Sequence, residues 1–182
     1  LMADTAVGRD IVFPELTEEQ HKSVAATVHE LVSVSNPLDY HTFAWNKEED
    51  LFATYSAMLA CGFDLSMLVL DFPREDRCSL ETWGPAVNAI TKAAEKTGAA
   101  TTVVSSLPES LPEPVATGLM EKGIAPLCGI RQALDAAQAA VQIGAAWRRS
   151  PDDMTLPGPG LHLQGPSQSL DEWQAKHELA SA

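Results

Sequence analysis

Ser66-Met67-Leu68-Val69-Leu70 is a short, largely apolar stretch with the length and composition of a buried β-strand. Similar short runs occur at 100–104 and at 124–128. A further run at 32–35 stops at Asn36-Pro37, because proline cannot donate to a strand ladder and restrains the residue before it. We expect each of these four runs to form one strand.

One helical pattern lies between each pair of predicted strands, at 46–62, 79–98 and 110–123. A helix before the first strand begins with the capping box Thr17-Glu18-Glu19-Gln20, and a long helix at 130–149 follows the last strand. Alternating strands and helices favour a parallel, doubly wound sheet with right-handed crossovers. The sequence therefore predicts a three-layer αβα fold with a parallel sheet of at least four strands.

The α/β pattern covers residues 17–149 and stops on both sides. Residues 1–14 contain no complete element, and residues 1–16 resemble the tail of a preceding domain. Residues 150–168 are rich in proline and glycine without apolar periodicity, which predicts a linker. In the last segment, 169–182, Ser169-Leu170-Asp171-Glu172 can cap a short helix, which we interpret as the start of a truncated domain.

Charge and cysteine content exclude several classes of function. The 25 acidic and 12 basic residues give a net charge of -13, a field that repels nucleic acid and anionic membranes. No apolar run reaches the roughly 18 residues of a membrane span. Three cysteines without a CxxC spacing indicate the reducing cytoplasm, with Cys61 and Cys128 expected in the core and Cys78 in a loop. No histidine stands at zinc-ligand spacing from them, so no metal site is predicted.

The first candidate site is the loop after the strand at 32–35. Ligands of doubly wound sheets bind beyond the carboxyl ends of the strands, so side chains that follow a strand are the candidates. Asp39 can fix the turn by accepting backbone amides. His41 has the chemistry of a base or a phosphocarrier, although a solvent-facing loop histidine is the favoured interpretation. The candidate residues of this loop are Asn36, Asp39, Tyr40, His41 and Thr42.

The second candidate site is Asp71-Phe72-Pro73-Arg74-Glu75-Asp76-Arg77, which follows the next strand. Asp71 could hold Mg²⁺ or accept a phosphoryl group, and Arg74 could clamp a phosphate or carboxylate. Salt bridges within this run of acids and arginines are the favoured alternative. The sequence contains no GxGxxG, GxxxxGK[ST] or GxSxG motif, so we assign no catalytic residue and no complete nucleotide site.

Several motifs in order resemble one family, the NDP-forming acyl-CoA synthetases related to succinyl-CoA synthetase. Ser33-Val34-Ser35-Asn36-Pro37-Leu38-Asp39 is similar to the Asn-Pro-Val-Asp signature of their second flavodoxin-like domain. Gly123-Ile124-Ala125-Pro126 and the segment from Arg131-Gln132-Ala133-Leu134 to Trp147-Arg148-Arg149 resemble its closing strand and helix. Leu170-Asp171-Glu172-Trp173 resembles the first helix of the ATP-grasp part, and Asp10-Ile11-Val12-Phe13-Pro14 resembles the tail of the preceding domain.

The resemblance implies a flavodoxin-like domain of a cytoplasmic ligase that joins a carboxylic acid to CoA. ATP or GTP is converted to the diphosphate and phosphate through an acyl phosphate and a phosphohistidine. It further implies that this chain holds no cofactor itself, whereas the full enzyme uses CoA, ATP and Mg²⁺. Its partners would be the CoA-binding, phosphohistidine and ATP-grasp domains of the same polypeptide, and a homo-oligomer is compatible with this arrangement.

This chain departs from the family at the loops that approach phosphate. Tyr40-His41-Thr42 and Phe72-Pro73 stand where the family has glycines, and His41 does not match the phosphohistidine. An alternative function is therefore a non-catalytic interaction or assembly module related to the family. A receiver-like domain with Asp71 as phosphoryl acceptor is the least favoured hypothesis, because no acidic pair follows an early strand.

The first prediction is that the isolated chain neither hydrolyses ATP nor forms acyl-CoA, because it lacks a phosphate-binding glycine loop and a matching phosphohistidine. The purified chain should give no acyl-CoA above background with ATP, CoA and a panel of carboxylic acids. Turnover that survives further purification would contradict this prediction.

Overall fold

The computed structural model describes residues 2–149 and 169–181 of the 182-residue chain. The chain divides into two units, Leu1–Gly144 and Ala145–Ala182. The linker predicted at 150–168 lies outside the described residues. Among the helices of the described ranges, none combines the length and apolarity needed to cross a membrane.

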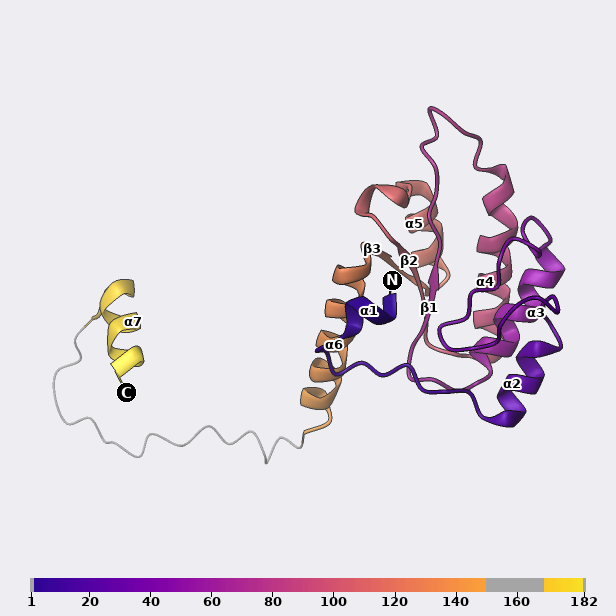
Figure 1. Ribbon diagram of the computed structural model, residues 1–182. Helices are drawn as coiled ribbons and strands as arrows, with labels where there is room; N and C mark the ends of the chain where they lie inside the picture. The colour runs from indigo at the N-terminus through magenta and orange to yellow at the C-terminus, as the bar shows by residue number, and fades with distance from the viewer. Residues whose placement is uncertain (1, 150–168, 182) are drawn as a thin grey trace. The chain divides into compact units, whose positions relative to one another are not determined.

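A parallel sheet of three strands forms the centre of the first unit (Figure 1). The strands are β1 (Ser66–Val69), β2 (Thr101–Ser105) and β3 (Ala125–Cys128), and they lie in the order β1-β2-β3. Leu68 of β1 pairs with Val103, and Val104 pairs with Leu127 of β3. The strands predicted at 66–70, 100–104 and 124–128 are therefore confirmed, as is the parallel α/β class.

The prediction of at least four strands is wrong for the part of the chain that the structure describes, because residues 32–35 do not join the sheet. Two local hydrogen bonds and one to a distant segment take the place of a ladder here. The Val32 N–H donates to the His29 carbonyl, and Ser35 Oγ donates to the Pro37 carbonyl. Asn36 Nδ2 donates to the Pro14 carbonyl across 3.1 Å. Side chains that bond nearby carbonyls compete with strand pairing, and here they prevail.

Helices cover both faces of the sheet and make the three layers (Figure 1). Helices α3 and α4 pack against each other on one face with α5, and α1 and α6 cover the other face. The helices of the first unit and the two 3₁₀ turns are α1 (Met2–Ala6), α2 (Glu18–Ala25), α3 (Glu48–Leu59), η1 (Glu81–Trp83), α4 (Gly84–Thr97), η2 (Pro108–Ser110), α5 (Glu113–Glu121) and α6 (Ile130–Trp147).

The larger core lies between the sheet and the layer of α3, α4 and α5. Leu68 and Val103 of the sheet pack there with Leu51 of α3, Ile90 of α4 and Leu119 of α5. Burying one such aliphatic side chain stabilises the fold by about 1.5–3 kcal/mol. The apolar spacing that predicts these helices from the sequence thus marks their buried faces.

The smaller core joins the amino-terminal segment to the other face of the sheet. Met2 and Ala6 of α1 pack with Val104 of β2 and with Leu134 of α6. The expectation that residues 1–14 contain no complete element is therefore wrong, because α1 lies within them. Whether this segment also continues a preceding domain stays a prediction.

Local signals set several helix ends as predicted. Thr17 Oγ1 accepts the Gln20 N–H at 3.3 Å, and Gln20 Oε1 accepts the Thr17 N–H at 2.8 Å, which completes the capping box. Helix α4 ends at Gly98, whose φ of 67° is a left-handed conformation that favours glycine. Helix α3 instead starts at Glu48, two residues inside the range predicted at 46–62, with Lys47 as its N-cap and Asn46 at a φ of 61°.

The second unit contains α7 (Glu172–Ser181), which confirms the predicted short helix. Asp171 is its cap: Asp171 Oδ1 accepts the Gln174 N–H at 2.7 Å, and Gln174 Oε1 accepts the Asp171 N–H at 3.2 Å. This reciprocal pair satisfies two backbone donors at the helix start.

Candidate functional site

Asp71 lies where β1 ends, at the edge of the sheet that carries ligand sites in doubly wound folds. Its Oδ1 accepts the Ser106 N–H at 2.6 Å, and its Oδ2 accepts Ser106 Oγ at 2.7 Å. The Asp71 carbonyl accepts Trp83 Nε1 at 2.7 Å. We call this arrangement the Asp71–Ser106 clamp. It fixes the loops after β1 and β2 to each other, so Asp71 has a positioning role before any role toward a ligand.

The start of α6 lies at the same edge, directly after β3. The Gly129 N–H donates to the Ser105 carbonyl at 2.9 Å, and Ile130 begins the helix. A Cβ on Gly129 would lie only 2.3 Å from Gln132 Oε1. The φ of Gly129, 95°, also favours glycine. Helix starts carry unsatisfied N–H groups and a partial positive charge. Arg131, in the first turn, adds a cation without a salt-bridge partner among the described residues.

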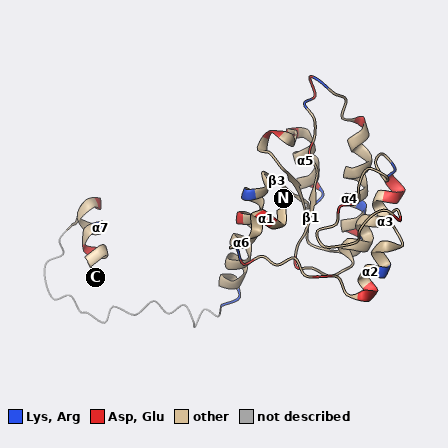
Figure 2. Ribbon diagram, viewed as in Figure 1, with Lys and Arg blue, Asp and Glu red and all other residues tan. Residues whose placement is uncertain are grey.

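Arg74 makes no hydrogen bond or ion pair with Asp71 among the described residues. Its Nε and Nη2 donate to the two carboxylate oxygens of Asp76 at 2.9 and 2.7 Å. The two side chains are 73% and 57% exposed, and Figure 2 shows basic and acidic residues at the tip of this loop. The internal salt bridge considered in the sequence analysis is confirmed, and it neutralises the charge with which Arg74 would bind an anion.

The loop at 36–42 has the turn predicted from its sequence. Asp39 Oδ1 accepts the His41 N–H at 3.0 Å, which confirms that Asp39 fixes the turn. His41 is exposed, with a φ of 56°, and its ring lies 5.8 Å from that of Phe43. The Thr42 carbonyl accepts the Trp45 N–H at 3.1 Å. These contacts support the solvent-facing interpretation of His41.

Tyr40 anchors the same loop to α3. Its hydroxyl lies 2.9 Å from the hydroxyl of Tyr55, and the two rings meet edge to face with centroids 5.4 Å apart. Burial is the main cause that raises the pKa of both phenols above 10.0. Both groups therefore stay protonated at physiological pH, and the pair serves to hold the loop.

Aromatic contacts link Trp45, which follows the first candidate loop, to Phe72 of the second through Trp83. The Trp45 ring lies edge-on to Trp83 at 5.3 Å, and Phe72 lies 6.4 Å from Trp83. None of the hydrogen bonds or ion pairs of the described residues joins Asn36–Thr42 to Asp71 or Arg74. The sequence analysis missed Ser106, whose position just after the strand at 100–104 is the only sequence signal of its pairing with Asp71.

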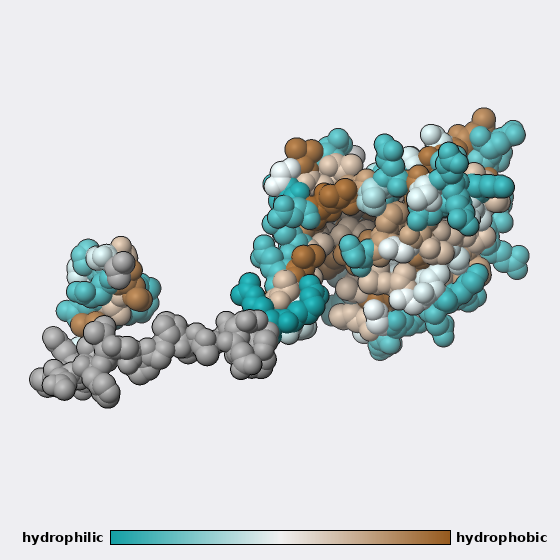
Figure 3. Space-filling model, turned by 90° about the horizontal axis from the view of Figure 1, so that it is seen from below, coloured by the Kyte–Doolittle hydropathy of each residue, from teal (hydrophilic) through white to brown (hydrophobic). Residues whose placement is uncertain are grey.

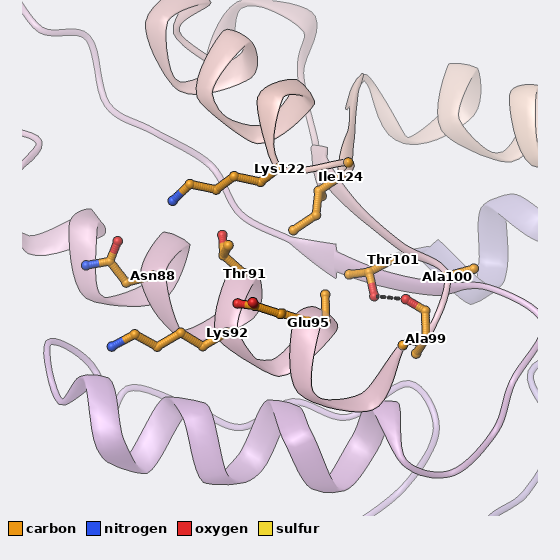
Figure 4. Close-up of a pocket in the computed structure, with 12 residues that line it drawn as sticks. Asn88, Thr91, Lys92, Glu95, Ala99, Ala100, Thr101, Lys122 and Ile124 are labelled. Carbon is orange, nitrogen blue, oxygen red and sulfur yellow. Dashed lines mark hydrogen bonds between the residues drawn. The ribbon is translucent and has the colours of Figure 1, made fainter.

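A hollow of about 620 Å³ lies at the opposite edge of the sheet, where β2 and β3 begin (Figure 4). Thr91, Lys92 and Glu95 of α4 line it, and Lys122 extends over it from the end of α5. Lys92 binds the carboxylate of Glu48, whose pKa is lowered chiefly by that bond. Glu48 thus neutralises Lys92, and the hollow contains both acidic and basic side chains.

Neither metal-ligating nor disulfide-forming clusters occur in the described ranges. No group of three His, Cys, Asp or Glu side chains there could hold a metal ion. Cys128 is exposed, so its expected place in the core is wrong; it ends β3, which pairs with no strand on its outer side among the described residues. Cys61 is half-buried, which raises the pKa of its thiol, and Cys78 is exposed as expected.

Comparison of the sequence with known protein families and with curated proteins finds no match.

The second prediction concerns the Asp71–Ser106 clamp. Asp71→Ala should lower the free energy of unfolding by about 1–2 kcal/mol, the range of a charge-assisted hydrogen bond reduced by solvent exposure. Ser106→Ala should cost less, because its backbone N–H still donates. Urea denaturation in a double-mutant cycle should show coupling between the two sites. Asp76→Ala is the control, with a change below about 0.5 kcal/mol; additive effects of the Asp71 and Ser106 substitutions would contradict the clamp.

The third prediction uses the two tyrosines of the chain, Tyr40 and Tyr55. Because their folded-state pKa values are raised, the folded protein keeps protons that the unfolded chain loses above pH 10. Stability is therefore complete below that pH and falls as the pH rises above it. Tyrosinate absorbance should appear at higher pH in the folded protein than in urea. Tyr40→Phe should bring the remaining Tyr55 closer to its ordinary pKa, because the Tyr40 hydroxyl adds to the effect of burial in raising it. Identical folded and unfolded titrations would refute the buried pair.

Proposed function

We propose that this chain is a domain of an NDP-forming acyl-CoA synthetase that lines one side of the acyl or phosphoryl site. The observation that carries the proposal is the Asp71–Ser106 clamp at the carboxyl edge of a parallel sheet. Ligand sites of such sheets lie at this edge, and the clamp holds two of its loops in one arrangement. The motif similarity given above supplies the reaction class.

The groups at this edge favour binding an anion over performing chemistry. The first N–H groups of α6 and the side chain of Arg131 suit a phosphate or carboxylate. His41 is held in an exposed turn, and Arg74 is paired with Asp76. In this proposal the phosphohistidine, CoA, nucleotide and Mg²⁺ belong to other domains of the same polypeptide. This chain contributes a positioned, positively polarised surface.

A second candidate function is a non-catalytic assembly module. It is favoured by exposed apolar side chains beside β1, among them Val12 and Val69. Tyr40-His41-Thr42 and Phe72-Pro73, in place of phosphate-approaching glycines, favour it as well. The two candidates differ in whether the parent enzyme needs the carboxyl edge of this domain for turnover.

The fourth prediction distinguishes the two candidate functions in the full-length parent protein. Arg131→Ala should lower kcat/KM for acyl-CoA formation by about a hundredfold, the scale of one lost charge-stabilising donor, with an unchanged melting temperature. Arg74→Ala is the matched control, because Asp76 already neutralises it and its loop tip is exposed. His41→Ala should also keep full activity. Normal kinetics in Arg131→Ala would favour the assembly module.

A further inference from the structure

The outer edge of β1 has a row of backbone groups that no described strand pairs. The Ser66 N–H donates to the Ala100 carbonyl, and the Leu70 N–H donates to the Val104 carbonyl, both at 2.9 Å. Alternate residues of a strand direct their N–H groups to opposite sides. The N–H groups of Met67 and Val69 therefore point away from β2, toward a side where the described chain supplies no further strand.

The other edge of the sheet is protected. The Gly129 N–H donates to the Ser105 carbonyl, so by the same alternation the nitrogen of Pro126 faces outward from β3. Proline has no N–H to offer there and blocks edge-to-edge pairing. β1 has no such proline, so β1 is the edge at which the sheet can be extended.

A groove of about 930 Å³ runs beside β1, and Figure 3 shows a hollow with largely hydrophobic walls on the lower face of the molecule. Four of the exposed large hydrophobic residues of the chain line this groove. Val12 is 81% exposed, Val141 65%, Val69 38% and Leu65 36%. A contiguous apolar surface of this kind marks an interaction site.

The groove has an apolar wall on each face of the sheet. On the side of the larger core the wall includes Tyr40, Tyr55, Met58 and Leu59, and on the side of the smaller core it includes Ile11, Ala137, Ala140 and Val141. A strand added to β1 would therefore be buried on both faces. Such strands are near-continuous runs of Val, Ile and Leu.

The charges of the groove are acidic. Asp10 and Asp64 line it, and no Lys, Arg or His does. Both carboxylates are exposed, and neither has a hydrogen-bond or ion-pair partner in the part of the chain that the structure describes. A second copy of this chain would bring its own acids and a net charge of -13 to this surface. The complementary occupant is basic.

We propose that the edge of β1 binds an extended segment of a partner protein as a fourth strand, with an apolar centre and flanking Lys or Arg residues. About five residues would span the edge, at roughly 3.3 Å per residue. Backbone hydrogen bonds to Met67 and Val69 give affinity, and the two apolar walls and the two aspartates select the sequence. The argument for this interaction does not rest on the acyl-CoA chemistry proposed above.

The fifth prediction is tested with a fluorescein-labelled octapeptide that carries alternating Val and Ile between two pairs of Lys. Fluorescence anisotropy with the full chain should show saturable binding that weakens with salt. Val69→Pro should reduce the affinity about tenfold or more, because it removes an N–H that faces the groove and leaves the ladder to β2 intact. Val69→Thr keeps that N–H and should bind like the native chain, and thermal melts confirm that both variants fold.

The charge requirement is tested by Asp10→Lys combined with Asp64→Lys. This variant should lose about tenfold in affinity for the basic peptide and gain affinity for the same peptide with Glu flanks. Glu121→Lys, outside the groove, is the matched control and should change neither. Equal binding by Val69→Pro and Val69→Thr would overturn the proposal. Slow hydrogen exchange of the Met67 and Val69 amides without peptide would also overturn it, since residues 32–35 would then fill the edge.

Self-association in sedimentation experiments that Val69→Pro abolishes would replace the partner by a second copy and overturn the proposal as well. In contrast, slowed exchange of the Met67 and Val69 amides on adding the basic peptide would support strand addition directly, because it reports new backbone hydrogen bonds at the proposed residues.

Discussion

The central strand β2 is the constraint on which the rest of the structure depends. All five of its residues are buried, and Val103 and Val104 are completely enclosed. Val103 joins the core beneath α3, α4 and α5, whereas Val104 joins the core beneath α1 and α6. One pair of adjacent residues thus connects both helical layers, and the registers of β1 and β3 are both set against it. A defect in β2 would loosen both cores at once, because interiors are close-packed.

Much of this fold is predictable because its signals are local. Short apolar runs separated by amphipathic segments mark β1, β2 and β3, and the capping box at Thr17 and the left-handed Gly98 mark helix ends. Residues 32–35 do not form the predicted strand, and their apolar pattern gives no sign of the reason. Ser35 and Asn36 bond carbonyls of Pro37 and Pro14 instead of supporting a ladder. Tertiary partners decide such cases.

The candidate site is predictable in position and much less so in chemistry. Parallel topology places Asp71 at the carboxyl edge, and the short side chain of Asp39 predicts its turn. The hydrogen-bond and ion-pair partners of the candidate residues do not follow from the residues themselves. Ser106 engages both oxygens of Asp71, and Asp76 engages Arg74. The type of a residue indicates what its side chain can bind. Only the folded structure shows which of these donors and acceptors already bond another residue of the chain.

The open edge of β1 and the carboxyl edge share one segment of chain. Tyr40 contributes to the wall of the groove and is held by Tyr55, and five residues later Trp45 packs against Trp83. Trp83 in turn donates to the carbonyl of Asp71, whose carboxylate forms the clamp with Ser106. The chain from Tyr40 to Trp45, together with the contacts of Trp83, therefore links the groove to the clamp. Because packed cores shift between discrete arrangements rather than deforming smoothly, the position of this segment at β1 constrains the geometry available at the carboxyl edge.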